Sequence, residues 1–202
     1  TGGLIGKSHQ VELNNVHATG TVTSNAYSQS DNFSDIKNYK TNLFTHTGGL
    51  IGQSTESHVT HGYALGKVEA SLNATVNAFA NIQMSSGGLV GSLSNTEIKQ
   101  SYAGGNVQHD HQVVGGATTR SSIGGLAGVN QNSSINIAYA SGSVSGNDNV
   151  GGLIGNNENG HISNAYASGA VTGTSQVGGL VGNHTGTGSI AQTYAIGKVT
   201  GT

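Results

Sequence analysis

An internal repeat constrains this chain more than any other feature of its sequence. A five-residue block, Gly-Gly-Leu-x-Gly, recurs six times, and each copy is followed by a second block that contains a ring residue (Tyr or His) and Ala. The distance from the first Gly to the ring residue is 15 in five copies and 16 in the last. Such constancy indicates one supersecondary unit stacked many times. The blocks begin at Gly2, Gly48, Gly87, Gly124, Gly151 and Gly178.

The spacing between successive blocks is not constant, and its variation locates the insertions. It runs 46, 39, 37, 27 and 27, so the minimal unit has 27 residues. All the additional length lies between the Val near the end of one unit and the Gly-Gly of the next. Residues 23–47, 69–86 and 108–123 are therefore predicted to be insertions at one corner of a single repeat segment, 1–202.

Three aliphatic columns run through the repeats and predict the fold. The first is Leu4, Leu50, Leu89, Leu126, Leu153 and Leu180. The second is Leu13, Val59, Ile98, Ile135, Ile162 and Ile190, and the third is Val22, Val68, Val107, Val144, Val171 and Val199. Three columns indicate about three short strands in each turn around a narrow core, with every coil hydrogen-bonded to the next. We predict an all-β parallel β-helix (solenoid) of six coils.

A ring residue and an Ala are adjacent in every unit. Because successive side chains of a strand point to opposite faces, an inward Ala places the preceding ring on the outside, whereas an inward ring column is the alternative. We expect the Ala to lie inside and the rings to form an external ladder. The rings are His17, Tyr63, Tyr102, Tyr139, Tyr166 and Tyr194.

Composition excludes several classes of protein. The chain has 34 Gly, no Pro, no Cys and only 8% charged residues, which disfavours long helices and disulfide scaffolds. The seven Lys and Arg form no basic stripe, so no nucleic-acid partner is predicted. No apolar run reaches the ~18–20 residues of a membrane span, and none is predicted in this segment.

The ends of the sequence carry no polar cap. Stacked coils need capped ends to prevent end-to-end pairing. This sequence begins inside a first block and stops where a seventh would begin. We therefore expect a fragment of a longer repeat array, monomeric as part of that longer chain.

The paired blocks resemble the GLUG repeat in all six units. They read GGL(I/V)G and NAYA(S/T)G.V.G, with departures at His17 in the first unit and Ala127 in the fourth. The resemblance implies a large bacterial surface or secreted protein, such as a filamentous-haemagglutinin-like adhesin, an autotransporter passenger or the non-catalytic part of an immunoglobulin A metalloprotease. It also implies an extracellular location and a right-handed helix, in keeping with the chirality of parallel connections. The motif contains no catalytic residue.

Catalytic and metal chemistry find little support in these residues. Catalytic carboxylates must share a cleft, and of nine Asp and Glu only Glu12 and Glu97 share a column, two coils apart. We predict no enzymatic activity and no cofactor. A metal site needs three or four converging ligands, so none is assigned. The histidines that come nearest to one are His58, His61, His109 and His111.

Recognition is expected on the insertions, because excursions from a regular scaffold commonly carry binding residues. Candidate ligand-binding residues are the insertion rings Tyr27, Phe33, Tyr39, Phe44 and Phe79. The predicted function is an adhesive segment that binds a protein or glycan on a host or neighbouring cell. Two alternatives stay open: a non-catalytic stalk of a secreted protease, and capture of metal or haem by insertion histidines.

Overall fold

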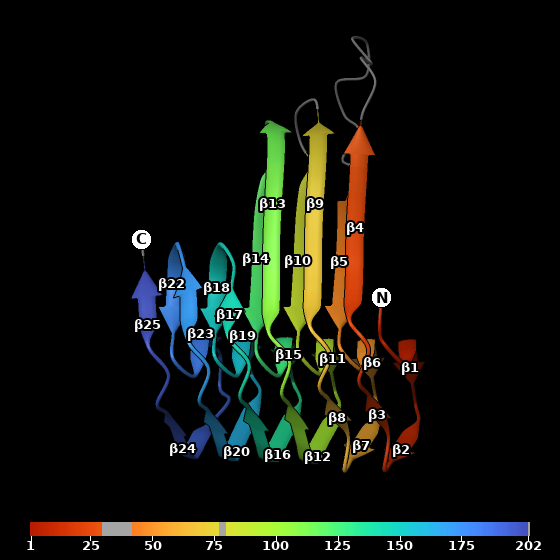
Figure 1. Ribbon diagram of the computed structural model, residues 1–202, viewed down its shortest axis with the longest axis vertical. Helices are drawn as coiled ribbons and strands as arrows, with labels where there is room; N and C mark the ends of the chain where they lie inside the picture. The colour runs from red at the N-terminus through yellow and green to blue at the C-terminus, as the bar shows by residue number, and fades with distance from the viewer. Residues whose placement is uncertain (30–41, 77–79, 202) are drawn as a thin grey trace.

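The structure is a computed structural model that describes residues 1–29, 42–76 and 80–201 of the chain. The described residues contain strands and no helix, and every strand pair is parallel. Strands of successive coils stack into four sheets, which we number in chain order (Figure 1). The predicted all-β parallel β-helix is confirmed; its handedness stays a prediction.

The first two sheets form the lower part of the coil stack. Sheet 1 is six-stranded and contains β1 (Ile5–His9), β6 (Ile51–Thr55), β11 (Val90–Ser94), β15 (Ala127–Gln131), β19 (Ile154–Glu158) and β23 (Val181–Thr185). Sheet 2 is eight-stranded and contains β2 (Glu12–Asn14), β3 (His17–Ala18), β7 (His58–Thr60), β8 (Tyr63–Ala64), β12 (Glu97–Ala103), β16 (Ser134–Ala140), β20 (His161–Ala167) and β24 (Ile190–Ala195).

The other two sheets carry the connections between coils. Sheet 3 contains β4 (Val22–Gln29), β9 (Val68–Val76), β13 (Val107–Gly115), β17 (Val144–Ser145), β21 (Val171–Gly173) and β25 (Val199–Gly201). Sheet 4 contains β5 (Asn42–Gly48), β10 (Asn81–Gly87), β14 (Thr118–Gly124), β18 (Asp148–Gly151) and β22 (Ser175–Gly178).

A full coil therefore has a fourth strand beyond the three that the aliphatic columns predict. Even the shortest connection, after Val144, contains β18, which pairs with its neighbours in sheet 4. Backbone groups of a buried segment need hydrogen-bond partners, and the next coil supplies them. The apolar columns missed this strand because its inward residues differ from coil to coil.

The described parts of the insertions are long strands that extend sheets 3 and 4. The extended parts of β4, β9 and β13 lie over those of β5, β10 and β14, and we call this two-layer projection the blade (residues 24–29, 42–46, 70–76, 80–85 and 109–122). In Figure 1 the blade rises above the short coils. Its apolar interior contains Leu72, Val76, Ile82 and Met84. The blade is held together because each inserted strand pairs in register with the equivalent strand of the neighbouring coil.

The rest of the stack, which we call the body, has the core that the columns predict. Leu50, Leu89, Leu126 and Leu153 are buried one above the other, with the second aliphatic column beside them. The Ala column also points inward, as predicted: the members in the four middle coils are completely buried, and these are Ala64, Ala103, Ala140 and Ala167.

The Gly-Gly pair is fixed by the closeness of neighbouring coils. A Cβ added at Gly88 would overlap the carbonyl oxygen of Gly125 and approach the Cβ of Ala103 at 2.9 Å. The inward Ala and the Gly pair are therefore parts of one contact, which explains why the two blocks recur together.

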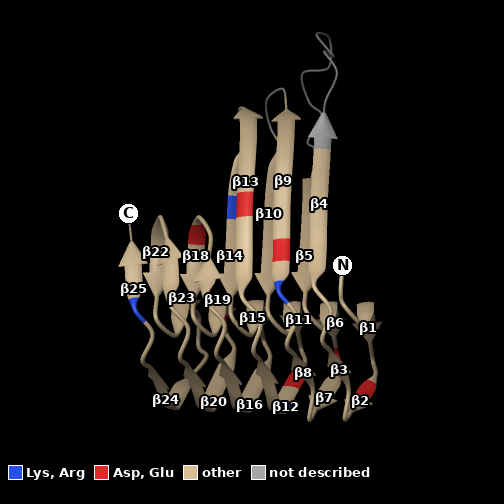
Figure 2. Ribbon diagram, in the orientation of Figure 1, with Lys and Arg blue, Asp and Glu red and all other residues tan. Residues whose placement is uncertain are grey.

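Charged residues are few in the described part of the chain, and they do not gather into a strip of one sign (Figure 2). Within the same residues there is no helix that could traverse a bilayer.

Candidate binding groove

A groove of about 600 Å³ crosses several coils where sheet 4 meets sheet 1. Sheet 4 belongs partly to the blade, and sheet 1 follows it directly through the Gly-Gly turn. One wall of the groove is therefore formed by the insertion strands β5, β10 and β14 together with β18, and the other by the repeated strands β6, β11, β15 and β19.

Parallel register arranges the groove residues in columns that run from coil to coil. The outermost column on sheet 4 is Phe44, Gln83 and Arg120, and the next is His46, Ser85 and Ser122. On sheet 1 the first column is Gln53, Ser92, Val129 and Asn156, and the second is Thr55, Ser94, Gln131 and Glu158. Because a parallel sheet spaces its strands by ~4.8 Å, equivalent polar groups recur along the groove at that interval.

The groove is polar and nearly uncharged. Its side chains are mainly amides and hydroxyls, which both donate and accept hydrogen bonds. Arg120 and Glu158 supply one charge of each sign, and Phe44 supplies an aromatic ring that is 53% exposed. This combination suits a neutral, hydroxyl-rich ligand better than an apolar or polyanionic one.

Some of these side chains are held in place by contacts across coils. The Nδ1 of His46 lies 2.6 Å from Oγ of Ser85, and burial lowers the pKa of His46 below its ordinary value, so the ring is neutral near pH 7. The amide of Asn183 donates to Oδ1 of Asn156 at 2.8 Å. The amide of Gln131 approaches Oε2 of Glu158 at 3.4 Å. The walls of the groove are thus partly ordered without a ligand.

Of the five predicted ligand-binding rings, the structure describes two. Phe44 lies in the groove, whereas Tyr27 lies on β4 in sheet 3, where its side chain is 74% exposed. Phe33, Tyr39 and Phe79 lie outside the described residues. The described pair does not form one cluster, because the two rings lie in different sheets of the blade.

Sequence reasoning missed most of the groove, although a signal for it exists. Phe44, Gln83 and Arg120 each lie four residues before a Gly-Gly pair. Counting backwards from each block, rather than forwards from each Val, aligns them in one column. The missing step was the recognition that insertions of different length end in strands of the same register.

The ring column forms the external ladder that the sequence predicts. His17, Tyr63 and the four tyrosines above them are stacked in sequence, with centroids 4.8–5.1 Å apart and planes within 5° of parallel. The pKa of Tyr139 is raised above 10.0, mainly by burial and to a smaller extent by the neighbouring Tyr102 and Tyr166. The ladder belongs to sheet 2 and lies away from the groove.

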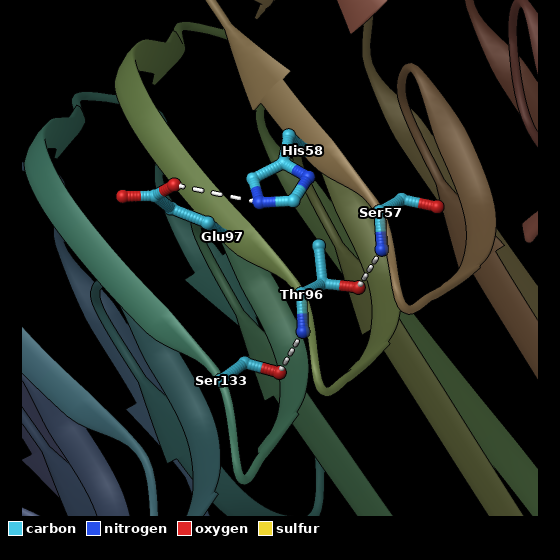
Figure 3. A network of polar contacts seen from close by, with 5 residues as sticks. All are labelled: Ser57, His58, Thr96, Glu97 and Ser133. Atoms are coloured by element: carbon cyan, nitrogen blue, oxygen red, sulfur yellow. Dashed lines mark hydrogen bonds and ion pairs between the residues drawn. The ribbon is translucent and has the colours of Figure 1, made fainter. Parts of the chain in front are cut away.

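The histidines of sheet 2 are part of a surface ladder between coils. Figure 3 shows His58 facing Glu97 of the next coil, at 3.8 Å between Nε2 and Oε2. Beside them the hydroxyls of Thr96 and Ser133 accept from the backbone N–H of Ser57 and Thr96. His61 lies nearby, with Nδ1 3.4 Å from Oδ1 of Asn14.

The insertion histidines lie elsewhere, at the opposite end of the coil. His109 and His111 both project from β13 in the blade, far from β7 in Figure 1, so His58 does not join them. Burial, followed by the neighbouring His111, lowers the pKa of His109 to about 4, which keeps the imidazole neutral near pH 7. Among the described residues, no three or more His, Cys, Asp or Glu are placed to hold a metal ion together.

Comparison with known proteins gives one match. A family model described as the GLUG motif matches residues 146–172 and 173–200, two consecutive units of the C-terminal part. This match confirms the resemblance there and indicates a repeat domain of a surface or secreted protein. No curated protein and no solved structure matches the chain.

Proposed function

We propose that this GLUG-repeat protein is a non-catalytic, adhesive segment of a bacterial surface or secreted protein, and that it binds an extended glycan in the groove between sheets 4 and 1. The groove itself carries the proposal. It is long, crosses several coils and repeats its polar groups at the coil spacing, which matches a ligand that is itself a chain of similar units.

The chemistry of the groove favours a glycan over a protein segment. Sugar hydroxyls can pair with the amides of Gln53, Gln83 and Gln131, and the C–H face of a sugar ring can pack on Phe44. A protein partner is more commonly anchored by a cluster of buried apolar and aromatic residues, whereas Phe44 is the one Phe, Tyr or Trp among the described residues that line the groove.

The proposed segment binds its ligand and catalyses no reaction. Glu158 is the acidic residue that lines the groove, and a hydrolytic site of the usual kind needs two carboxyl groups in one cleft. We therefore expect binding without turnover, with the ligand outside the cell or on its surface.

Glycan binding by residues 1–202 tests the proposal, with Phe44→Ala and Gln83→Ala as groove variants and Tyr27→Ala as the matched control. Tyr27 is an exposed ring of the same blade but lies in sheet 3. We expect each groove variant to weaken binding at least about tenfold, or about 1.4 kcal/mol, and the control to leave it unchanged. Circular dichroism should show the same β-sheet signal in all.

Three other outcomes would contradict the proposal. No glycan binding by the unmodified chain would favour a passive stalk, as in a secreted protease. Binding that survives both groove variants but is lost when the insertions are shortened would place recognition elsewhere on the blade. Release of shortened oligosaccharides during incubation would show that the segment is an enzyme.

A further inference from the structure

The interior of the blade contains a cluster of side chains that its fold does not require. His109 is 2% exposed and lies between sheets 3 and 4. Its Nδ1 is 2.8 Å from Oγ of Ser86, and its Nε2 is 3.3 Å from Sδ of Met84. Met84, the only methionine of the chain, is itself 2% exposed.

His111 adds a second imidazole beside the first. Its ring centroid is 6.0 Å from that of His109, in an edge-on arrangement. The Nδ1 of His111 is buried and has no hydrogen-bond partner. A buried polar atom without a hydrogen-bond partner lowers the stability of the fold, so a ligand or another cause must explain its presence.

The neighbouring coil shows that packing alone does not call for these residues. In register with His109 and His111, strand β9 has Ala70 and Leu72, which fill the same interior with apolar groups. On β14, Ser121 is in register with Met84. The imidazoles and the thioether therefore meet at one level of the blade only.

The donor set matches a soft, monovalent metal ion. Two ligands of one ion with bonds of about 2.0 Å to nitrogen and 2.3 Å to sulfur lie about 3.5 Å apart, close to the 3.3 Å between Nε2 of His109 and Sδ of Met84. Thioether sulfur selects Cu(I) over harder ions. Since all three donors are neutral, a single positive charge is also the least costly to bury.

The cluster borders an open hollow at His111. An open hollow of about 480 Å³ is lined by His111, Asp110 and Asn147, at the step where the blade ends and the short coils begin. From these observations we propose that His109, Met84 and His111 form a Cu(I)-binding site inside the blade. Met84 also borders the groove from the interior of the blade, but the site does not depend on the proposed glycan binding.

Anaerobic titration of residues 1–202 with Cu(I), in competition with a chromophoric Cu(I) chelator, tests the site. We expect one equivalent to bind, and Met84→Leu and His111→Gln each to weaken binding at least about tenfold. Met-to-Leu exchanges in cores usually cost little stability, so the fold should persist. X-ray absorption should show a sulfur ligand in the unmodified protein and none in Met84→Leu.

The controls use His58 of β7 in sheet 2 and His61, which follows that strand directly. His58→Gln and His61→Gln, which change exposed rings at the other end of the coil, should leave the affinity unchanged. Failure of the unmodified chain to bind Cu(I) stoichiometrically would overturn the site. So would an affinity that is unchanged in either Met84→Leu or His111→Gln, which would leave the contact of His109 with Met84 as a structural hydrogen bond.

Discussion

The body and the blade are built by the same parallel stacking, but they differ in what their columns contain. In the body, the columns that close the coil repeat one residue type, as in Leu50, Leu89, Leu126 and Leu153. In the blade, one column holds Ala26, Leu72 and His111, and the column facing it from sheet 4 holds Leu43, Ile82 and Thr119. Parallel register is thus kept in both regions, whereas residue identity is kept only in the columns of the body that close the coil.

The difference separates the residues that determine the coil from those available for binding. The body must close a tight turn at every coil, and the Gly-Gly and Ala contact leaves no space for other side chains. The blade needs only an apolar layer between two extended sheets, which many residues can supply. Both proposed sites draw on the blade: one uses the outer face of sheet 4, and the other uses its interior.

A Cβ at the Gly-Gly contact should have the largest effect on the body. At Gly125 it would overlap the carbonyl oxygen of Gly152 and approach Ala140, whereas at Gly6 it would have no neighbour within 4 Å. We expect Gly125→Ala to lower the free energy of unfolding by at least about 3 kcal/mol, and Gly6→Ala to change it by less than about 0.5 kcal/mol. Urea denaturation measures both, and equal effects would show that coil spacing is not the constraint.

The same difference in column identity explains why the sequence predicts the strands of the body better than those of the blade. A column of identical residues, such as the inward Ala that follows each ring residue, can be recognised without coordinates because its spacing from Gly-Gly is nearly fixed. The strands β5, β10 and β14 have no such column, since their inward residues differ and their insertions vary in length, and their register emerges only by counting back from each Gly-Gly pair. Phe44 was therefore predicted as a contact residue, but its alignment with Gln83 and Arg120 was not.

Substitutions that create a cavity in the core of the body or of the blade should show whether the blade unfolds independently of the body. Leu126 in the body and Ile82 in the blade are both fully buried. We expect Leu126→Ala to cost about 3 kcal/mol and Ile82→Ala about 2 kcal/mol. Amide hydrogen exchange should accelerate throughout the body in the first variant, but only in β9, β10 and their neighbours in the second, as a local opening.

The exposed Val114 of the blade provides the control for these cavities. Val114→Ala should change the unfolding free energy by less than about 0.5 kcal/mol. If Ile82→Ala instead accelerates exchange equally in β19 and β20, body and blade form one cooperative unit and the division drawn between them is wrong.

A buried body column of mixed residue type allows a smaller test. Asn130 donates to Oδ1 of Asn157 at 2.6 Å, and Asn157 donates to the carbonyl of Gly160 at 2.9 Å, whereas coil three has Leu93 in the same column. Asn157→Ala should cost about 1–3 kcal/mol because it leaves buried partners unpaired. The double change Asn130→Leu and Asn157→Leu should cost less than this single change, as measured by thermal unfolding.

The aromatic ladder gives the smallest expected effect, and it belongs to the body alone. Tyr139 has a stacked ring on each side, whereas Tyr194 has one. At about 0.5–1.5 kcal/mol for each stacked pair, Tyr139→Ala should cost about 1 kcal/mol more than Tyr194→Ala. If both cost the same, the rings are aligned by the backbone register and contribute no stacking energy.

The pKa of Tyr139 provides a second test of the interactions within the ladder. Its folded pKa is raised above the unfolded 10.0, by burial first and then by Tyr102 and Tyr166. The folded chain therefore holds this proton more tightly, so the stability from Tyr139 is present below pH 10 and is lost as the pH rises through the raised pKa. Tyrosinate absorbance should show a late-ionising fraction that disappears in Tyr139→Phe. If the titration curve is unchanged in that variant, the ladder does not perturb its central ring, and the uniform columns of the body are explained by backbone spacing alone.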